Sequence, residues 1–173
     1  MLFIVSHTLF ITYFAYRSNP PKQAYFTIKQ YYGVHMDLYA DNILDHFRDP
    51  RNTGALKKAT VDHEELNHAC GDSLHLWLLL DGGKVTKVGW EGEGCAISQA
   101  SMSILSEELE GKSEDEILKL TKDDIYEMLG VPIGPRRFKC ALMSLHVLKN
   151  ALHKAQGNTP QTWVETVSIP EEN

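Results

Sequence analysis

The strongest constraint on the fold is a short turn between two segments of strand-like pattern. Asp81, Gly82 and Gly83 separate the apolar run 73–80, SLHLWLLL, from the segment 84–90, KVTKVGW. A turn of this kind joins antiparallel strands, because glycine readily adopts the positive φ angles that tight hairpin turns need. Residues 64–68 add a candidate third strand. The sequence therefore predicts a small antiparallel sheet of about three strands.

Helical spacing dominates the rest of the chain. Apolar residues recur every three or four positions over 136–155, which predicts a long amphipathic helix. The segment 97–110 starts with small residues and stops before Gly111, a residue type that commonly follows a helix end. The segment 38–47 has helical spacing as well.

Two capping patterns indicate further short helices between these segments. Ser113 is followed three residues later by Glu116, and Thr121 is followed in the same way by Asp124. In a capping box the two side chains satisfy each other's backbone N–H groups at the helix start. The predicted fold class is therefore α+β, a small antiparallel sheet covered by helices. We expect the polar tail at 158–173 to be frayed.

The first 35 residues differ from the remainder in charge. They contain three basic residues and no acidic one, although the whole chain has a net charge of -6. The apolar stretch 1–16 is shorter than the roughly 20 residues that span a bilayer. This N-terminal stretch has three explanations: a membrane anchor or signal, a structured extension, or a gene start placed too far upstream, with the true start at Met36. We favour the last, with a domain over 36–157, and expect no membrane partner.

Charge and cysteine content exclude several classes of protein. An acidic chain with a pI near 5.7 is a poor nucleic-acid binder, because phosphate backbones attract basic surfaces. The chain has only three cysteines, and an odd number leaves at least one without a partner in the chain, which argues against a disulfide scaffold. They suit a reducing compartment, so we expect a cytoplasmic protein with thiols that are buried or chemically used.

Each cysteine lies where one predicted element ends or another begins. Cys70 precedes a glycine, Cys95 follows a glycine-rich loop, and Cys140 falls in the first turns of the last long helix. A single cysteine is more often a small buried apolar residue, but three at such junctions favour thiolate chemistry. Helix N-termini and the basic residues before Cys140, among them Lys139, would stabilise thiolates. Asp72 is the nearest candidate for a fourth metal ligand, although it could be a turn residue.

Four blocks of sequence, in this order, resemble the IscU, NifU N-terminal and SufU family of iron–sulfur cluster assembly scaffolds. They are LYADNILDHFRDPRNTG at 38–54, NHACGDSL at 67–74, GEGCAISQASMS at 92–103 and RRFKCALMSLHVLKNAL at 136–152. The resemblance covers about residues 36–155 and implies the IscU/SufE-like fold. It implies a scaffold that accepts persulfide sulfur from a cysteine desulfurase, assembles a [2Fe–2S]-type cluster and passes it to apo-proteins or carriers.

The resemblance also implies the site residues. Cys70, Cys95 and Cys140 match the three ligand cysteines, each a candidate sulfur acceptor, and Asp72 matches the family's aspartate, which is associated with cluster lability and can bind zinc. Lys139 beside the third cysteine and the aromatic Tyr39 match supporting positions. The implied cofactors are a transient [2Fe–2S] cluster with its iron, or Zn²⁺ as the alternative or resting metal. A homodimer is a further expectation.

The details leave two functions open within the family and one outside it. IscU proteins have histidine immediately before the third cysteine, whereas this chain has Lys139 there, as SufU proteins have lysine. The chain nevertheless lacks SufU's insertion between the second and third cysteines. A zinc-bound SufU-type sulfur acceptor is therefore the alternative to a cluster scaffold. In either case the chain is not an enzyme in the ordinary sense, although a sulfurtransferase-like step fits both. A cysteine hydrolase would need one activated cysteine with a base, rather than three that share a pattern.

Overall fold

The computed structural model describes residues 39–167. All of these residues belong to one compact unit. The predictions for residues 1–35 and the proposed start at Met36 lie outside the described residues. Among the described helices, none combines the length and apolarity that crossing a membrane requires.

A three-stranded antiparallel sheet forms the centre of the fold, in the order β1-β2-β3. The strands are β1 (Val61–Asn67), β2 (Asp72–Asp81) and β3 (Lys84–Glu93). The turn between β2 and β3 contains Gly82 and Gly83 at φ 56° and 74°, a region that glycine enters without steric penalty. The predicted hairpin and third strand are therefore confirmed, with β1 beginning earlier than expected.

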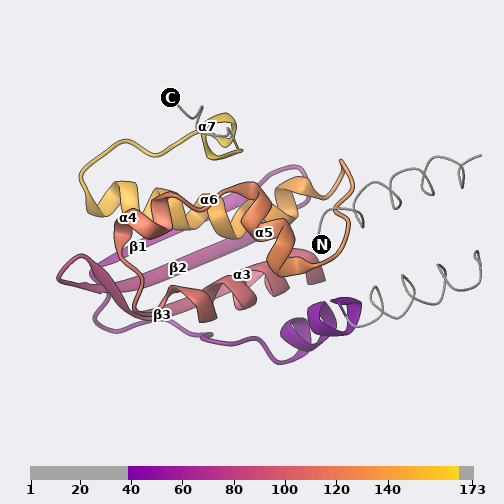
Figure 1. Ribbon diagram of the computed structural model, residues 1–173, viewed down its shortest axis with the longest axis horizontal. Helices are drawn as coiled ribbons and strands as arrows, with labels where there is room; N and C mark the ends of the chain where they lie inside the picture. The colour runs from indigo at the N-terminus through magenta and orange to yellow at the C-terminus, as the bar shows by residue number, and fades with distance from the viewer. Residues whose placement is uncertain (1–38, 168–173) are drawn as a thin grey trace, which may run out of the picture. The chain divides into compact units, whose positions relative to one another are not determined.

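The helices pack against the sheet, as the α+β prediction requires (Figure 1). The described elements are a helical segment at 39–48, α3 (Ala96–Leu109), α4 (Glu114–Leu118), α5 (Lys122–Leu129), α6 (Phe138–Ala155) and α7 (Trp163–Val167). Helix α6 packs on β1 and β2, α3 packs on β3, and the two helices pack against each other. The predicted fold class is confirmed.

Both predicted capping boxes are present. The Ser113 side chain accepts from the Glu116 backbone N–H at the start of α4, and the Glu116 carboxylate accepts from the Ser113 N–H. Thr121 and Asp124 make the same exchange at the start of α5. These local bonds fix where each short helix begins, and α5 packs on both α3 and α6.

The core lies between the sheet and the helices. Leu74, Leu76 and Leu78 alternate along β2 and are almost fully buried, which is the period of a strand with one face on the core. Helix α6 differs from the amphipathic prediction, because every residue from 140 to 152 is buried. The additional cover comes from residues 158–167, which we call the C-terminal strap. The tail that we expected to be frayed therefore includes α7, packed on α6.

The loop that follows the helical segment at 39–48 is tied to β3 through Trp90. The Trp90 indole Nε1 donates to the Arg51 carbonyl at 2.7 Å, and its backbone N–H donates to the Asn52 carbonyl at 3.1 Å. The Trp90 carbonyl accepts from the Gly54 N–H at 2.8 Å. Trp90 is 2% exposed, so these bonds are shielded from water. One residue, through its side chain and its backbone, thus joins the N-terminal part of the described chain to the sheet.

Candidate metal centre

Three separate junctions of the fold meet at one end of the sheet. Cys70 lies in the turn between β1 and β2, beside Gly71, whose φ of 77° the turn requires. Cys95 is the residue that precedes α3, directly after β3, and Cys140 lies in the first turn of α6. Asp72 is the first residue of β2. The prediction that the cysteines lie at element boundaries is confirmed.

Within the described residues, the group that could hold a metal ion consists of Cys70, Asp72 and Cys140. One ligand atom from each lies within 4.8 Å of the others, and the two sulfur atoms are 3.6 Å apart. Cys70 is exposed, whereas Asp72 and Cys140 are buried, with exposed fractions of 3% and 5%. Two thiols and a carboxylate converging on one point form a donor set suited to zinc or iron.

Cys95 lies next to this group but is not a member of it. Its backbone N–H donates to Asp72 Oδ1 at 3.3 Å, and its sulfur accepts from Ser98 Oγ at 3.8 Å. The structure therefore brings three of the four predicted ligands together and places the fourth beside Asp72. The role of Cys95 as a ligand remains a prediction.

The Asp72 carboxylate has an oxygen atom that is free to bind a cation. Its Oδ2 atom is buried and has no hydrogen-bond partner in the structure. Burial raises the pKa of Asp72, but the neighbouring thiols of Cys70 and Cys140, together with other donors near the carboxylate, outweigh burial and leave the pKa below its ordinary value. A buried acceptor without a partner is costly unless a ligand satisfies it. This orphaned oxygen shows that the residues present fit a metal ion.

The structure corrects the expectation that the surroundings of Cys140 stabilise a thiolate. Burial raises the pKa of the Cys140 thiol well above its ordinary value, and the neighbouring Cys70 thiol and Asp72 carboxylate raise it further. The negative charge of Asp72 opposes a second negative charge beside it. Cys140 is therefore a protonated thiol in the metal-free protein, and a metal ion must displace that proton to bind it.

The two supporting residues predicted from the resemblance contact other parts of the fold. The Lys139 ammonium lies over the Trp163 ring, 5.6 Å from its centroid. Within residues 39–167, the ion pairs of the structure do not include Lys139. Tyr39 is 42% exposed, and its ring lies against Gly130 at the end of α5, where a β-carbon would collide with it. The supporting roles of Lys139 and Tyr39 remain predictions.

Gly94 determines where Asp72 lies, a role that the sequence did not reveal. A β-carbon at Gly94 would lie 2.8 Å from Asp72 Cγ and 2.6 Å from Ser98 Oγ. We expect Gly94→Ala to lower the free energy of unfolding of the metal-free protein by about 1–3 kcal/mol, as overpacking does. We also expect a roughly tenfold loss of zinc affinity, because the carboxylate is displaced.

Thermal unfolding and a chelator competition for zinc measure the two effects. Gly134→Ala is the matched control, because a β-carbon there meets no atom within 4 Å. Unchanged zinc affinity in Gly94→Ala, with unfolding as in the control, would contradict the positioning role.

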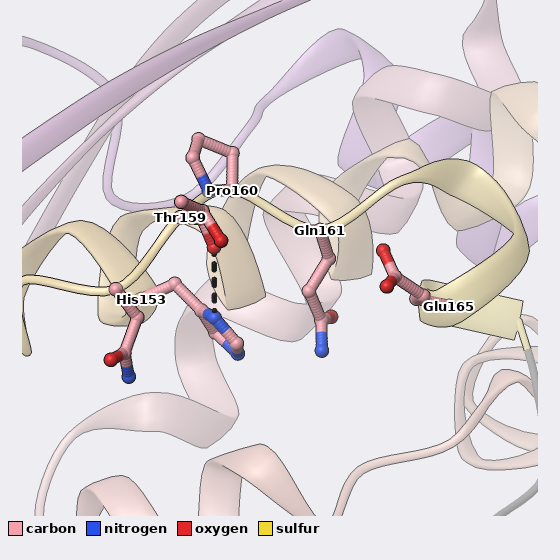
Figure 2. Close-up of a pocket in the computed structure, with 6 residues that line it drawn as sticks. His153, Thr159, Pro160, Gln161 and Glu165 are labelled. Carbon is pink, nitrogen blue, oxygen red and sulfur yellow. Dashed lines mark hydrogen bonds between the residues drawn. The ribbon is translucent and has the colours of Figure 1, made fainter.

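The pocket shown in Figure 2 is not part of this centre. Its lining residues are His153, Asn158, Thr159, Pro160, Gln161 and Glu165, from the end of α6 and the C-terminal strap. None of them is a predicted ligand. The candidate site is therefore the end of the sheet where the cysteines lie, and not this pocket.

Comparison with known proteins agrees with the geometry. Residues 38–161 match the sequence model described as the NifU-like N terminal domain. The chain belongs to this family. The family resemblance is thereby confirmed, and it covers the sheet, helices α3–α6 and all four predicted ligands.

Relatives of the NifU-like domain include both types of protein that the sequence leaves open. A zinc-dependent sulfurtransferase SufU of Bacillus subtilis (strain 168) is 34% identical over 137 residues, which is 69% of this chain and 92% of the relative. An iron–sulfur cluster assembly scaffold protein IscU of Thermotoga maritima is 32% identical over 133 residues, 68% of this chain and 94% of the relative.

A solved structure supports the same fold for the domain. It is of a protein described as an iron–sulfur cluster assembly scaffold for the SUF system of Fervidobacterium islandicum AW-1. The two structures match with a TM-score of 0.58 and 30% sequence identity, over 64% of this chain and 93% of the other.

Proposed function

We propose that this protein is an iron–sulfur cluster assembly scaffold, which accepts persulfide sulfur from a cysteine desulfurase and transfers the finished cluster to apo-proteins or carriers. The observation that carries the proposal is the convergence of Cys70, Asp72 and Cys140, with a buried carboxylate oxygen left without a partner. Cys95, beside Asp72, is the proposed fourth ligand. The cluster is cargo: iron and sulfide are the substrates of assembly, and the finished cluster is its product.

The exposure of the cysteines suggests how sulfur would arrive. A thiolate attacks the outer sulfur of the desulfurase persulfide, the sulfur–sulfur bond of the donor breaks, and the donor cysteine leaves as a thiolate. Cys70 is exposed and Cys140 is a buried thiol of raised pKa. Cys70 is therefore the most accessible of the three candidate acceptors. This sulfurtransferase-like exchange leaves a persulfide on the acceptor cysteine, and an external reductant must supply two electrons to release its outer sulfur as the sulfide of the cluster.

The mixed donor set favours a cargo that leaves again. Thiolates are soft ligands that suit zinc and iron–sulfur clusters, whereas a carboxylate is a hard ligand and holds such a cargo less firmly.

A zinc-bound sulfur acceptor is the second candidate function, favoured by the similarity to the Bacillus relative named a zinc-dependent sulfurtransferase. Zinc would occupy the same ligands. Metal content after anaerobic purification separates the two functions. We further propose a cytoplasmic protein that forms homodimers.

Replacing Asp72 tests the exchange role of its carboxylate. We expect Asp72→Ala to lengthen the lifetime of a bound cluster in air by about tenfold, because the labile ligand is lost, and to weaken zinc binding by about tenfold. The decay of the cluster's visible absorbance and a chelator competition measure the two effects. Asp81→Ala, at the opposite end of the same strand, is the matched control. Equal cluster lifetimes in Asp72→Ala and the wild type would count against the role.

A further inference from the structure

One face of α6 is covered by the C-terminal strap along its whole length. Lys139, His146, Asn150 and His153 recur at spacings that place them within about 60° of one another around the helix. Each contacts the strap. At the far end, His153 Nδ1 lies 3.2 Å from the Thr159 carbonyl oxygen, as Figure 2 shows. The strap therefore follows this row of polar residues from the C-terminal end of α6 toward its N-terminus.

The middle of the row fixes the strap firmly. Asn150 Oδ1 accepts from the Gln161 backbone N–H at 2.7 Å. His146 is 3% exposed, its ring stacks on Trp163 with centroids 4.1 Å apart, and its Nδ1 lies 2.7 Å from Thr166 Oγ1. Buried bonds of this kind hold a segment in one arrangement. The position of Trp163 is thus determined by α6 itself.

Lys139 ends the row, and its neighbour in sequence is the ligand Cys140. Its ammonium lies over the Trp163 ring at 5.6 Å from the centroid, within the range of a cation–π interaction. A divalent ion held by thiolates and a carboxylate leaves negative charge at the site, and Lys139 is the cation next to it in sequence. The long lysine stem can reach in more than one direction.

We propose that Trp163 is a positioning residue that holds the Lys139 cation away from the metal centre and so keeps the bound metal or cluster easier to release. The inference rests on the proposed function. Trp163 lies two residues beyond the family match, which ends at residue 161. Without the ring, Lys139 can turn toward the negative site and stabilise its occupied form.

Replacing Trp163 by leucine removes the ring and tests the proposal. We expect Trp163→Leu to bind zinc about twofold to fivefold more tightly than the wild type, the size of a cation–π interaction at a partly exposed site. Trp163→Phe keeps an aromatic face and should restore an affinity near that of the wild type. In a Lys139→Gln background the same leucine substitution should leave zinc affinity unchanged. Chelator competition measures the wild type and all four variants, including Lys139→Gln alone.

A second measurement uses the metal-free protein and reports the lysine directly. The protons on the Lys139 side chain next to the ammonium should resonate upfield in the wild type, because they lie over a ring, and return to ordinary values in Trp163→Leu. A gain in zinc affinity that persists without Lys139, or an unshifted lysine in the wild type, would overturn the inference. A wild-type protein that binds neither zinc nor a cluster would instead count against the proposed function.

Discussion

Replacing Cys140 by serine is expected to lower the affinity for zinc by at least about 100-fold, since even residues that only orient ligands can change affinity by 10–100-fold. The Cys140 sulfur is 3.6 Å from that of Cys70, and the orphaned Asp72 oxygen belongs to the same group. A serine hydroxyl does not lose its proton as a thiol does, so it cannot supply the missing thiolate. We expect no stable cluster on this variant. Chelator competition under anaerobic conditions measures the loss.

The controls for this experiment separate ligation from folding. Met143→Leu is a volume-conserving change in the buried part of α6, and it should bind zinc as the wild type does. Cys70→Ser should show the same loss as Cys140→Ser. A comparable loss in Cys95→Ser would make Cys95 the fourth ligand, and unchanged affinity would remove it from the site. Zinc affinity of Cys140→Ser close to that of the wild type would contradict the proposed metal centre.

Replacing Trp90 by alanine is expected to have the largest effect on stability, lowering the free energy of unfolding by about 3–5 kcal/mol. The side chain is 2% exposed, so its loss leaves a cavity that the surrounding core cannot fully close. It also removes the indole bond to the Arg51 carbonyl, which measures 2.7 Å. Chemical denaturation monitored by circular dichroism gives the change directly.

Trp77→Ala is the matched control for Trp90→Ala, because it truncates the same residue type on the neighbouring strand. Trp77 is only half-buried and stacks on His75, with ring centroids 3.9 Å apart. Its loss should lower the free energy of unfolding by about 1 kcal/mol, the size of one aromatic pair. Equal effects of the two substitutions would contradict the role of Trp90 as the link between the loop at 49–54 and the sheet.

Local patterns in the sequence predicted most elements because the determining interactions are local. The turn at Gly82 and Gly83 needs positive φ angles, and the capping residues Ser113 and Thr121 act within three residues of themselves. The strap was missed because its stability depends on partners far away in sequence. α7 is five residues long, too short to persist alone, and it is held by His146 and other residues of α6.

The candidate site shows the same division. The cysteines and Asp72 were identified from their motifs, but no pattern reveals that the sulfurs of Cys70 and Cys140 lie 3.6 Å apart. The raised pKa of Cys140 could not be predicted, because the sequence shows the basic residues nearby but neither the burial of the thiol nor its proximity to the Asp72 carboxylate. The need for glycine at position 94 also depends on a contact with Asp72 across the fold.

The cysteines come from three distant parts of the chain, and this has a thermodynamic consequence. An ion that binds at their junction cross-links the β1–β2 turn to the start of α6, contacts that the unfolded chain does not have. Binding is then linked to folding, and a free ion at 100 times its dissociation constant adds about 2.7 kcal/mol to stability. The melting temperature of this protein therefore reports the supply of metal ion as well as the packing of its core.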